Sequence, residues 1–153
     1  MRRRRPEDAA ALLAALTPVH EQDGYPLHAV HLTTAWLYDG LEDAWVAEHA
    51  GRLVGHVALS PDRHLTRFFV AVEARGSGAG AALLGTVETW ADERGVTLEL
   101  DVVEHNIDAQ RLYEHRGWER TGTVVATWVS EIGPWPDAYT YRRPAAGSPG
   151  SGR

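Results

Sequence analysis

A loop of alternating glycines lies within VEARGSGAGAALL, between an apolar run and an alanine-rich run. Glycines at positions 76, 78 and 80 let backbone N–H groups turn toward a ligand, because no side chain intervenes. The helix predicted to begin near Gly80 adds unpaired N–H groups and a partial positive charge. Arg75 adds a cation that can make charge-assisted contacts. This combination favours binding of a phosphate or diphosphate group.

Two other interpretations of the loop stay open on these residues alone. The loop could be a plain strand-to-helix turn that holds no ligand. It could also bind a dinucleotide, since GSGAGA fits Gly-x-Gly-x-x-Ala and Asp101 closes the next predicted strand, where a ribose-binding acid would lie. Against a dinucleotide site, three residues separate the strand from the first glycine, and the preceding strands form hairpins. A Walker-type loop is excluded because no Gly-Lys-Ser/Thr ending follows.

The overall composition excludes several classes of site and partner. The 153 residues contain no cysteine, which excludes disulfides, thiolate metal sites and a cysteine nucleophile. The net charge of -6 argues against a nucleic-acid-binding surface, although four arginines follow the first methionine. His28 and His31 are three residues apart, but no third ligand accompanies them. We therefore expect no metal site and no nucleic-acid partner.

We also expect no targeting signal and no association with a membrane. No apolar run approaches the roughly 18–20 residues that cross a bilayer. The first residues mimic a signal peptide, but Glu7 and Asp8 interrupt them and no small-residue cleavage site follows. The expectation is a cytoplasmic protein with one domain over residues 1–144 and a low-complexity, disordered tail over residues 145–153.

The elements that must position the loop alternate between strand and helix patterns. Apolar spacing and turn residues predict strands at 2–5, 45–49, 53–59, 65–72, 96–103, 118–130 and 138–143. Helices are predicted at 7–20, 28–38, 80–94 and 106–116. Hairpins in the first half, followed by a strand–helix–strand crossover, predict an α+β fold with a central mixed, mostly antiparallel sheet of about six or seven strands.

Two separated motifs occur together in this sequence. The first is FFVAVEARGSGAGAALL, in which Arg75, Gly78 and Gly80 follow a predicted strand. The second is an asparagine before a helix that ends Leu-Tyr-x-x-x-Gly-aromatic, as in VVEHNIDAQRLYEHRGWE. Its matching residues are Asn106, Ala109, Leu112, Tyr113, Gly117 and Trp118. Together the motifs resemble those of the GCN5-related N-acetyltransferase (GNAT) superfamily, whose acyl-CoA loop reads Arg/Gln-x-x-Gly-x-Gly/Ala after a strand. The order of elements also matches that family over almost the whole chain.

The resemblance implies a single-domain acyl-CoA N-acyltransferase fold, with acetyl-CoA as cosubstrate and no metal. Two neighbouring strands, 65–72 and 97–102, would splay apart and admit the pantetheine arm of the coenzyme. The arm would bond to backbone groups of Val70 and Val72. The diphosphate would lie on the N–H groups of Arg75, Gly76, Ser77, Gly78, Ala79, Gly80 and Ala81. A primary amine would then attack the thioester directly.

Such a transfer needs a proton donor for the leaving thiolate, and the resemblance implies Tyr113. A tyrosine with an ordinary pKa near ~10 stays protonated at neutral pH. The other interpretation is an aromatic side chain in the core, next to Gly117 and Trp118. Asn106 would bond the arm of the coenzyme, cap the last helix, or do both, because its side chain and backbone are separate groups.

The general base is less sharply indicated. Many members of the family carry a glutamate near the start of the strand before the glycine loop, whereas this chain has His64 there. A histidine with an ordinary pKa near ~6.5 can accept a proton in the working range, although a surface role is an equal alternative. Glu99, Asp101 and Glu104 are further candidates, and strand alternation prevents all three from facing one side.

The acceptor is expected to be the amine of a small molecule or a peptide. Trp36, Trp128 and Trp135 are candidates for the pocket wall, and GPWPDAY for the specificity loop. The late tryptophan-bearing strands also make a homodimer plausible. Two alternatives remain: an acyl-CoA-binding sensor without turnover, and a nucleotide-binding oxidoreductase domain.

Overall fold

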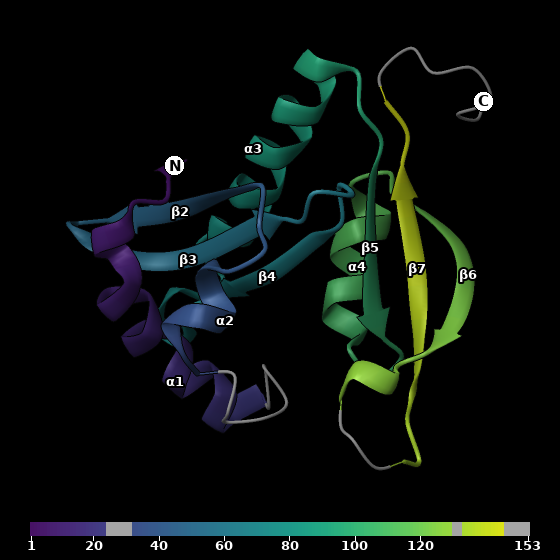
Figure 1. Ribbon diagram of the computed structural model, residues 1–153, viewed down its shortest axis with the longest axis horizontal. Helices are drawn as coiled ribbons and strands as arrows, with labels where there is room; N and C mark the ends of the chain where they lie inside the picture. The colour runs from purple at the N-terminus through teal and green to yellow at the C-terminus, as the bar shows by residue number, and fades with distance from the viewer. Residues whose placement is uncertain (24–31, 130–132, 146–153) are drawn as a thin grey trace. The chain divides into compact units, whose positions relative to one another are not determined.

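The computed structural model describes residues 1–23, 32–129 and 133–145 (Figure 1). Its helices are α1 (Ala9–Asp23), α2 (Thr34–Tyr38), α3 (Ala79–Arg94) and α4 (Ile107–His115). Its strands are β1 (Arg2–Arg3), β2 (Asp43–His49), β3 (Arg52–Leu59), β4 (Leu65–Val70), β5 (Leu98–Val103), β6 (Glu119–Val125) and β7 (Asp137–Arg143). Short 3-10 turns lie at Pro6–Asp8, Val72–Ala74 and Thr127–Val129. The order of helices and strands confirms the α+β class predicted from the sequence.

The described residues pair into two antiparallel sheets, with strand orders β1-β2-β3-β4 and β5-β7-β6. The crossover β4–α3–β5 therefore runs from one sheet to the other, and in the described part of the chain it adds no parallel pair to either. The chain divides into two compact units, Met1–Val87 and Glu88–Arg153. A single domain over residues 1–144 stays a prediction. Of the predicted tail, only Ala145 is described, and its N–H donates to Thr97 Oγ1 (3.3 Å).

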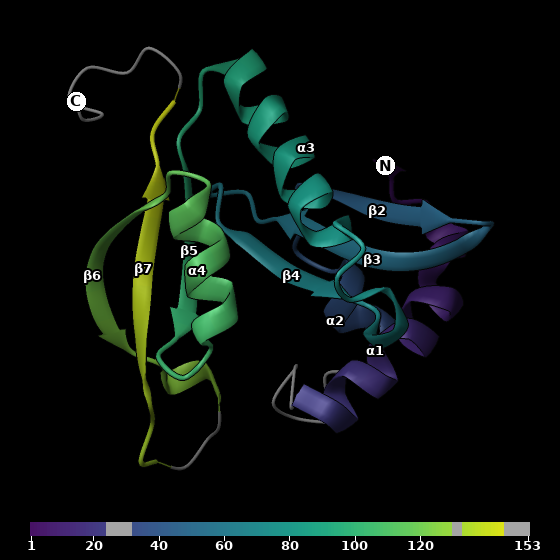
Figure 2. The ribbon, with the colours of Figure 1, turned by 180° about the vertical axis from the view of Figure 1, so that it is seen from behind.

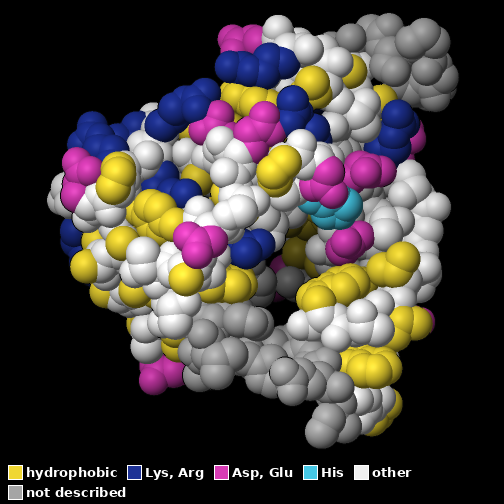
Figure 3. Space-filling model, in the orientation of Figure 1, with side chains coloured by type: hydrophobic (Ala, Val, Ile, Leu, Met, Phe, Trp, Pro, Cys, Tyr) yellow, Lys and Arg dark blue, Asp and Glu magenta, His cyan; other side chains and the backbone are white. Residues whose placement is uncertain are grey.

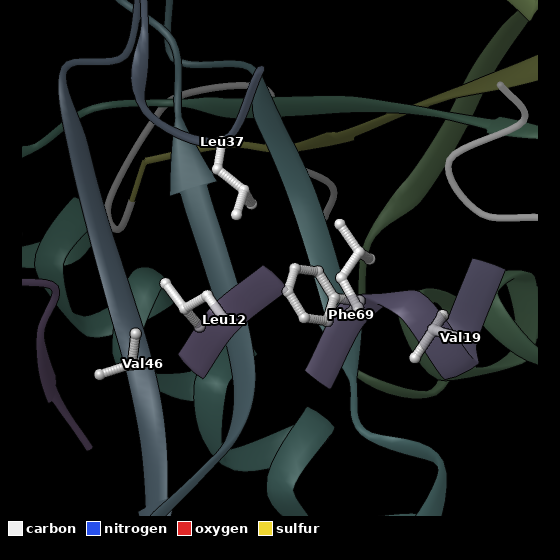
Figure 4. Close-up of a cluster of buried hydrophobic side chains, with 6 residues drawn as sticks. Leu12, Val19, Leu37, Val46 and Phe69 are labelled. Atoms are coloured by element: carbon white, nitrogen blue, oxygen red, sulfur yellow. The ribbon is translucent and has the colours of Figure 1, made fainter. Parts of the chain in front are cut away.

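Helices α1 and α2 cover one face of the first unit's sheet (Figure 1). Residues opposite each other on adjacent strands share a face, and Val46, His56 and Phe69 form such a row. Spacings of three and four residues put the apolar side chains of α1 on the side that faces this row. Figure 4 shows the resulting cluster of buried side chains. Its members are Leu12, Leu16, Val19, Leu37, Val46 and Phe69.

Helix α3 covers the opposite face of that sheet (Figure 2), and Gly55 lets it approach closely. Gly55 lies in the next row, between Ala47 and Val70. A Cβ atom at position 55 would lie 2.8 Å from Leu83 Cδ1 and 3.2 Å from the carbonyl oxygen of Phe69. Because both distances are shorter than an ordinary contact, a larger residue would push the first half of α3 off the sheet.

The second unit places α4 against one face of its sheet. Leu98, Leu100 and Val102 are buried on β5, and they alternate with the exposed Glu99 and Asp101. This alternation confirms the strand pattern predicted for this segment. Among the described helices, none combines the length and the apolar character needed to cross a bilayer.

Candidate active site

The glycine loop has the conformation that its glycines permit. Gly76 and Gly78 have φ angles of +79° and +87°, a region in which a Cβ atom is strained. The N–H of Ser77 donates to the carbonyl of Ala74 (3.2 Å), and the hydroxyl of Ser77 accepts from the N–H of Ala79 (3.3 Å). The loop therefore folds back on itself directly before the first turn of α3.

Several N–H groups of this loop are left for a ligand. The N–H of Arg75 donates to the carbonyl of Val72 (3.3 Å), and the N–H of Ala82 donates to that of Gly78 (3.0 Å). Within the described part of the chain, no hydrogen bond engages the N–H groups of four residues: Gly76, Gly78, Gly80 and Ala81. These groups gather at the positive end of a 16-residue helix, where an anion is favoured.

Val70, the last residue of β4, presents its backbone at the outer edge of the first unit's described sheet. Gly55 is its partner on β3, and the N–H of Ala71 donates to the carbonyl of Val54 (2.8 Å). In an antiparallel ladder this pattern makes Gly55 and Val70 a non-hydrogen-bonded pair, so the N–H and C=O of Val70 point away from β3. β4 is the outer strand of its sheet among the described residues. Val72 follows in a 3-10 turn and uses its carbonyl to accept from Arg75.

Asn106 is the N-cap of α4, which confirms the capping interpretation. Its Oδ1 accepts from the N–H of Ala109 (3.2 Å), and its own N–H donates to the carbonyl of Val103 (3.0 Å). Within the described residues, no hydrogen bond uses the Nδ2 amide, and the side chain is exposed. The cap therefore leaves one donor of this residue available to a ligand.

Tyr113 lies in the interior of the second unit, with 6% of its surface exposed. Its ring packs against Trp118 at a centroid distance of 5.7 Å and against Tyr141 at 5.9 Å. The predicted helix and the aromatic neighbour are both confirmed. A core position and a proton-donor role are compatible, because the apolar ring of a tyrosine can pack in the core while its O–H group donates a proton.

The candidate bases lie in different parts of the chain. His64 lies directly before β4 and is partly exposed; its N–H donates to Ser60 Oγ (3.1 Å) and its carbonyl accepts from the N–H of Ser60 (2.9 Å). Glu99 and Asp101 project from the exposed face of β5, whereas Glu104 follows the end of that strand. Strand alternation thus leaves two carboxylates on one face, as expected.

The predicted acceptor-pocket tryptophans belong to separate units. Trp36 lies on α2, where the Arg67 guanidinium stacks 4.9 Å from its ring centroid. Trp128 and Trp135, in the second unit, expose 52% and 38% of their surface. His28 and His31 lie outside the described residues. Within the described ones, no cluster of three or more His, Asp or Glu side chains could hold a metal ion.

The sequence did not mark several buried polar residues, among them His56 and Glu88. His56 is fully buried on β3, and burial lowers its pKa to about 4. Glu88 is buried on α3 and accepts hydrogen bonds from Arg116 and Trp118. The sequence offered only a weak signal for either, a polar residue within an apolar strand or helix.

Comparison with known proteins identifies the family. A model of the acetyltransferase (GNAT) family matches residues 9–118. The peptidyl-lysine N-acetyltransferase YiaC of Escherichia coli is 31% identical over 102 residues, which cover 63% of this chain and 65% of that protein. An aminoglycoside N(6')-acetyltransferase type 1 of Serratia marcescens is 36% identical over 97 residues, covering 60% and 66%. The chain thus spans less than two thirds of the length of these curated relatives.

Solved structures share the fold over more of the chain. A ribosomal-protein-alanine N-acetyltransferase from Brucella melitensis superposes with a TM-score of 0.74 at 27% identity, covering 94% of this chain and 98% of that one. A nourseothricin acetyltransferase gives a TM-score of 0.58 at 32% identity, covering 67% and 65%. The family model covers more than half of the residues, including the glycine loop and Tyr113. The chain belongs to the acetyltransferase (GNAT) family.

Proposed function

We propose that this protein is an N-acetyltransferase that moves an acetyl group from acetyl-CoA to a primary amine by direct attack in a ternary complex. The observation that carries the proposal is the set of four N–H groups, at Gly76, Gly78, Gly80 and Ala81, that have no partner among the described residues. A diphosphate is the group that fits such a set at a helix N-terminus, and Arg75 supplies a cation beside it.

The remaining coenzyme contacts come from donors and acceptors that the fold leaves available. The outward N–H and C=O of Val70 suit the amide groups of a pantetheine arm, which would pair with the free edge of β4 as an added strand does. The N–H of Val72 and the Nδ2 amide of Asn106 are the next candidates. Each of these groups is polar and lacks a partner among the described residues, so a ligand would satisfy it.

The chemistry divides between an acid and a base. The amine nitrogen attacks the thioester carbon, a C–N bond forms, and the C–S bond breaks. A backbone N–H near Val70 is the candidate donor to the developing oxyanion. Tyr113 gives its hydroxyl proton to the leaving sulfur, and the proton lost by the amine passes to a base and on to solvent. His64 is the first candidate for that base and Asp101 is the second.

The acceptor class is a small molecule or a peptide with a primary amine. The relatives named above act, by their names, on peptidyl lysine, on aminoglycosides and on a ribosomal-protein alanine. Acidic side chains gather over β5 and β7 on the face shown in Figure 3, and Glu99 and Asp101 are exposed on β5. This charge favours a cationic amine through steering. A homodimer remains a further proposal, which sedimentation tests.

The test is release of free CoA from acetyl-CoA with a panel of amines: lysine peptides, alanine N-terminal peptides, aminoglycosides and polyamines. Turnover with at least one amine supports the proposal. Binding of acetyl-CoA without turnover favours the sensor instead. A thermal-shift comparison with NAD and NADP addresses the oxidoreductase alternative, because a ligand that binds only the folded state raises its stability. Stabilisation by NAD but not by acetyl-CoA would defeat the proposal.

A further inference from the structure

Glu88 is a buried carboxylate on α3 that accepts hydrogen bonds from two residues in the segment after α4, Arg116 and Trp118. Its Oε1 accepts from Arg116 Nη2 (2.6 Å), and both its oxygens accept from Arg116 Nε (3.2 Å each). Its Oε2 accepts from Trp118 Nε1 (2.8 Å). Only 7% of the Glu88 surface is exposed, so these charge-assisted bonds compensate the burial of the carboxylate.

The same two residues bind the backbone of Tyr113. The N–H of Arg116 donates to the carbonyl of Tyr113 (3.1 Å), and the N–H of Trp118 donates to it as well (3.0 Å). Gly117 lies between them with a φ of +88°, which turns the chain so that both N–H groups reach one oxygen. Arg116 and Trp118 therefore bind Tyr113 through their backbones and Glu88 through their side chains.

The ring of Tyr113 is held by two aromatic neighbours. Trp118 packs on it with ring planes at 51°, and Tyr141 packs on it at 48°. The hydroxyl of Tyr141 donates to Glu114 (2.5 Å), as the indole N–H of Trp118 donates to Glu88. Each neighbour is thus anchored by a carboxylate. Glu88 is the buried one of the two, because the side chain of Glu114 is 50% exposed.

We propose that Glu88 is a positioning residue: through the indole N–H of Trp118 it fixes the ring of Tyr113 at the angle needed for proton donation to the leaving sulfur. This inference rests on the proposed function. Its physical basis is that a catalytic group must be held to within a fraction of an ångström, and a misplacement of about 1 Å costs on the order of 10²-fold in rate. The Glu88–Trp118 bond removes the rotation of the indole that would allow such a shift.

The sharpest single change is Trp118→Phe, which keeps an aromatic ring against Tyr113 but deletes the N–H donor to Glu88. We expect kcat to fall about tenfold with the KM for acetyl-CoA unchanged, because the coenzyme contacts are made elsewhere. Trp90→Phe is the matched control. Trp90 is another buried tryptophan; it lies on α3, with the Arg94 guanidinium over its ring. The Trp90→Phe variant should lose a similar amount of stability while its kcat stays within about twofold.

A double variant separates positioning from general loosening of the fold. If Trp118 acts through Tyr113, the loss from Trp118→Phe disappears when it is measured in a Tyr113→Phe background, because no proton donor remains to be positioned. Glu88→Gln keeps an acceptor for the indole and should retain most of kcat, whereas Glu88→Leu removes it and should match Trp118→Phe. Circular dichroism of each variant confirms that it folds, and the indole N–H resonance of Trp118 reports the bond without any turnover.

The outcomes distinguish this inference from the proposed function. Absence of turnover in the unmodified protein with every amine defeats the proposed function, whatever the variants do. Turnover in the unmodified protein together with additive effects of Trp118→Phe and Tyr113→Phe overturns the positioning role alone. An equal loss of kcat in Trp90→Phe also overturns it, because the effect would then follow from any buried tryptophan.

Discussion

The ring of His56 donates from Nδ1 to the carbonyl oxygen of Arg67 at 2.7 Å, across a bulge between β3 and β4. Arg67 has a φ of +49°, so the bulge holds a non-glycine residue in the left-handed region. The other ring nitrogen, Nε2, lies 3.1 Å from Arg4 Nη1 and must accept, since a guanidinium has no acceptor. His56 is therefore neutral in the folded protein.

A pH-dependent stability follows from this arrangement. Burial lowers the pKa of His56 to about 4, and an unfolded histidine titrates near ~6.5. Between these values the unfolded chain binds a proton that the folded chain rejects, so the free energy of unfolding falls as pH drops from about 6.5 to about 4. The total loss is on the order of 3 kcal/mol. Urea denaturation at pH 7 and pH 5 measures the first part of this loss, about 2 kcal/mol.

His56→Gln is the comparison for this prediction. A glutamine amide can still donate to the Arg67 carbonyl but does not titrate. We expect the variant to be less stable than the unmodified protein at pH 7 and to lose less stability on going to pH 5. The lowered pKa values of Asp8 and Asp92 act below their ordinary value of 3.8, outside this window. An identical pH slope in the two proteins would contradict the assignment.

Gly78→Ala should weaken binding of acetyl-CoA by about tenfold, since a Cβ atom at a φ of +87° distorts the loop that presents the N–H groups. Gly95→Ala is a matched control, because Gly95 has a φ of +66° at the other end of the same helix. Both variants should lose about 1–2 kcal/mol of stability. Calorimetric titration with acetyl-CoA separates them, and equal affinities for the two would argue against a diphosphate site at the loop.

Tyr113→Phe should reduce kcat by about 10²-fold with little change in the KM for acetyl-CoA, as expected for loss of a general acid. The phenyl ring keeps the contacts with Trp118 and Tyr141, so the fold should persist. Tyr139→Phe, on β7 beneath the Arg120 guanidinium, is the control for removal of a hydroxyl. Steady-state kinetics with a saturating amine makes the measurement, and unchanged turnover in Tyr113→Phe would remove the acid assignment.

The pH profile of kcat/KM discriminates the two candidate bases. If His64 accepts the proton, activity should decline below a pH near ~6.5, and His64→Gln should lower the rate by about tenfold or more and abolish that limb. If Asp101 is the base, Asp101→Asn has the larger effect on the rate. Glu99→Gln, on the same exposed face of β5, controls for loss of negative charge. Full activity in both base variants would indicate that solvent carries the proton.

The parts predictable from the sequence are those that depend on neighbours along the chain. Glycines at 76, 78 and 95 adopt the positive φ angles that other residues avoid, and Asn106 caps the helix that follows it. The alternation of Glu99 and Asp101 with buried leucines was visible as a period of two. These features are local because they follow from steric limits and hydrogen bonds within a few residues.

Only the tertiary structure decided which buried polar groups meet. His56 reaches a carbonyl 11 residues away, and Glu88 reaches an indole 30 residues away, so neither partner is marked by any spacing in the sequence. The bulge that turns the Arg67 carbonyl toward His56 depends on the pairing of β3 with β4. Such contacts form because packing brings distant residues together in an interior without water. There, leaving a polar group unpaired costs more free energy than ordering the residues that pair with it.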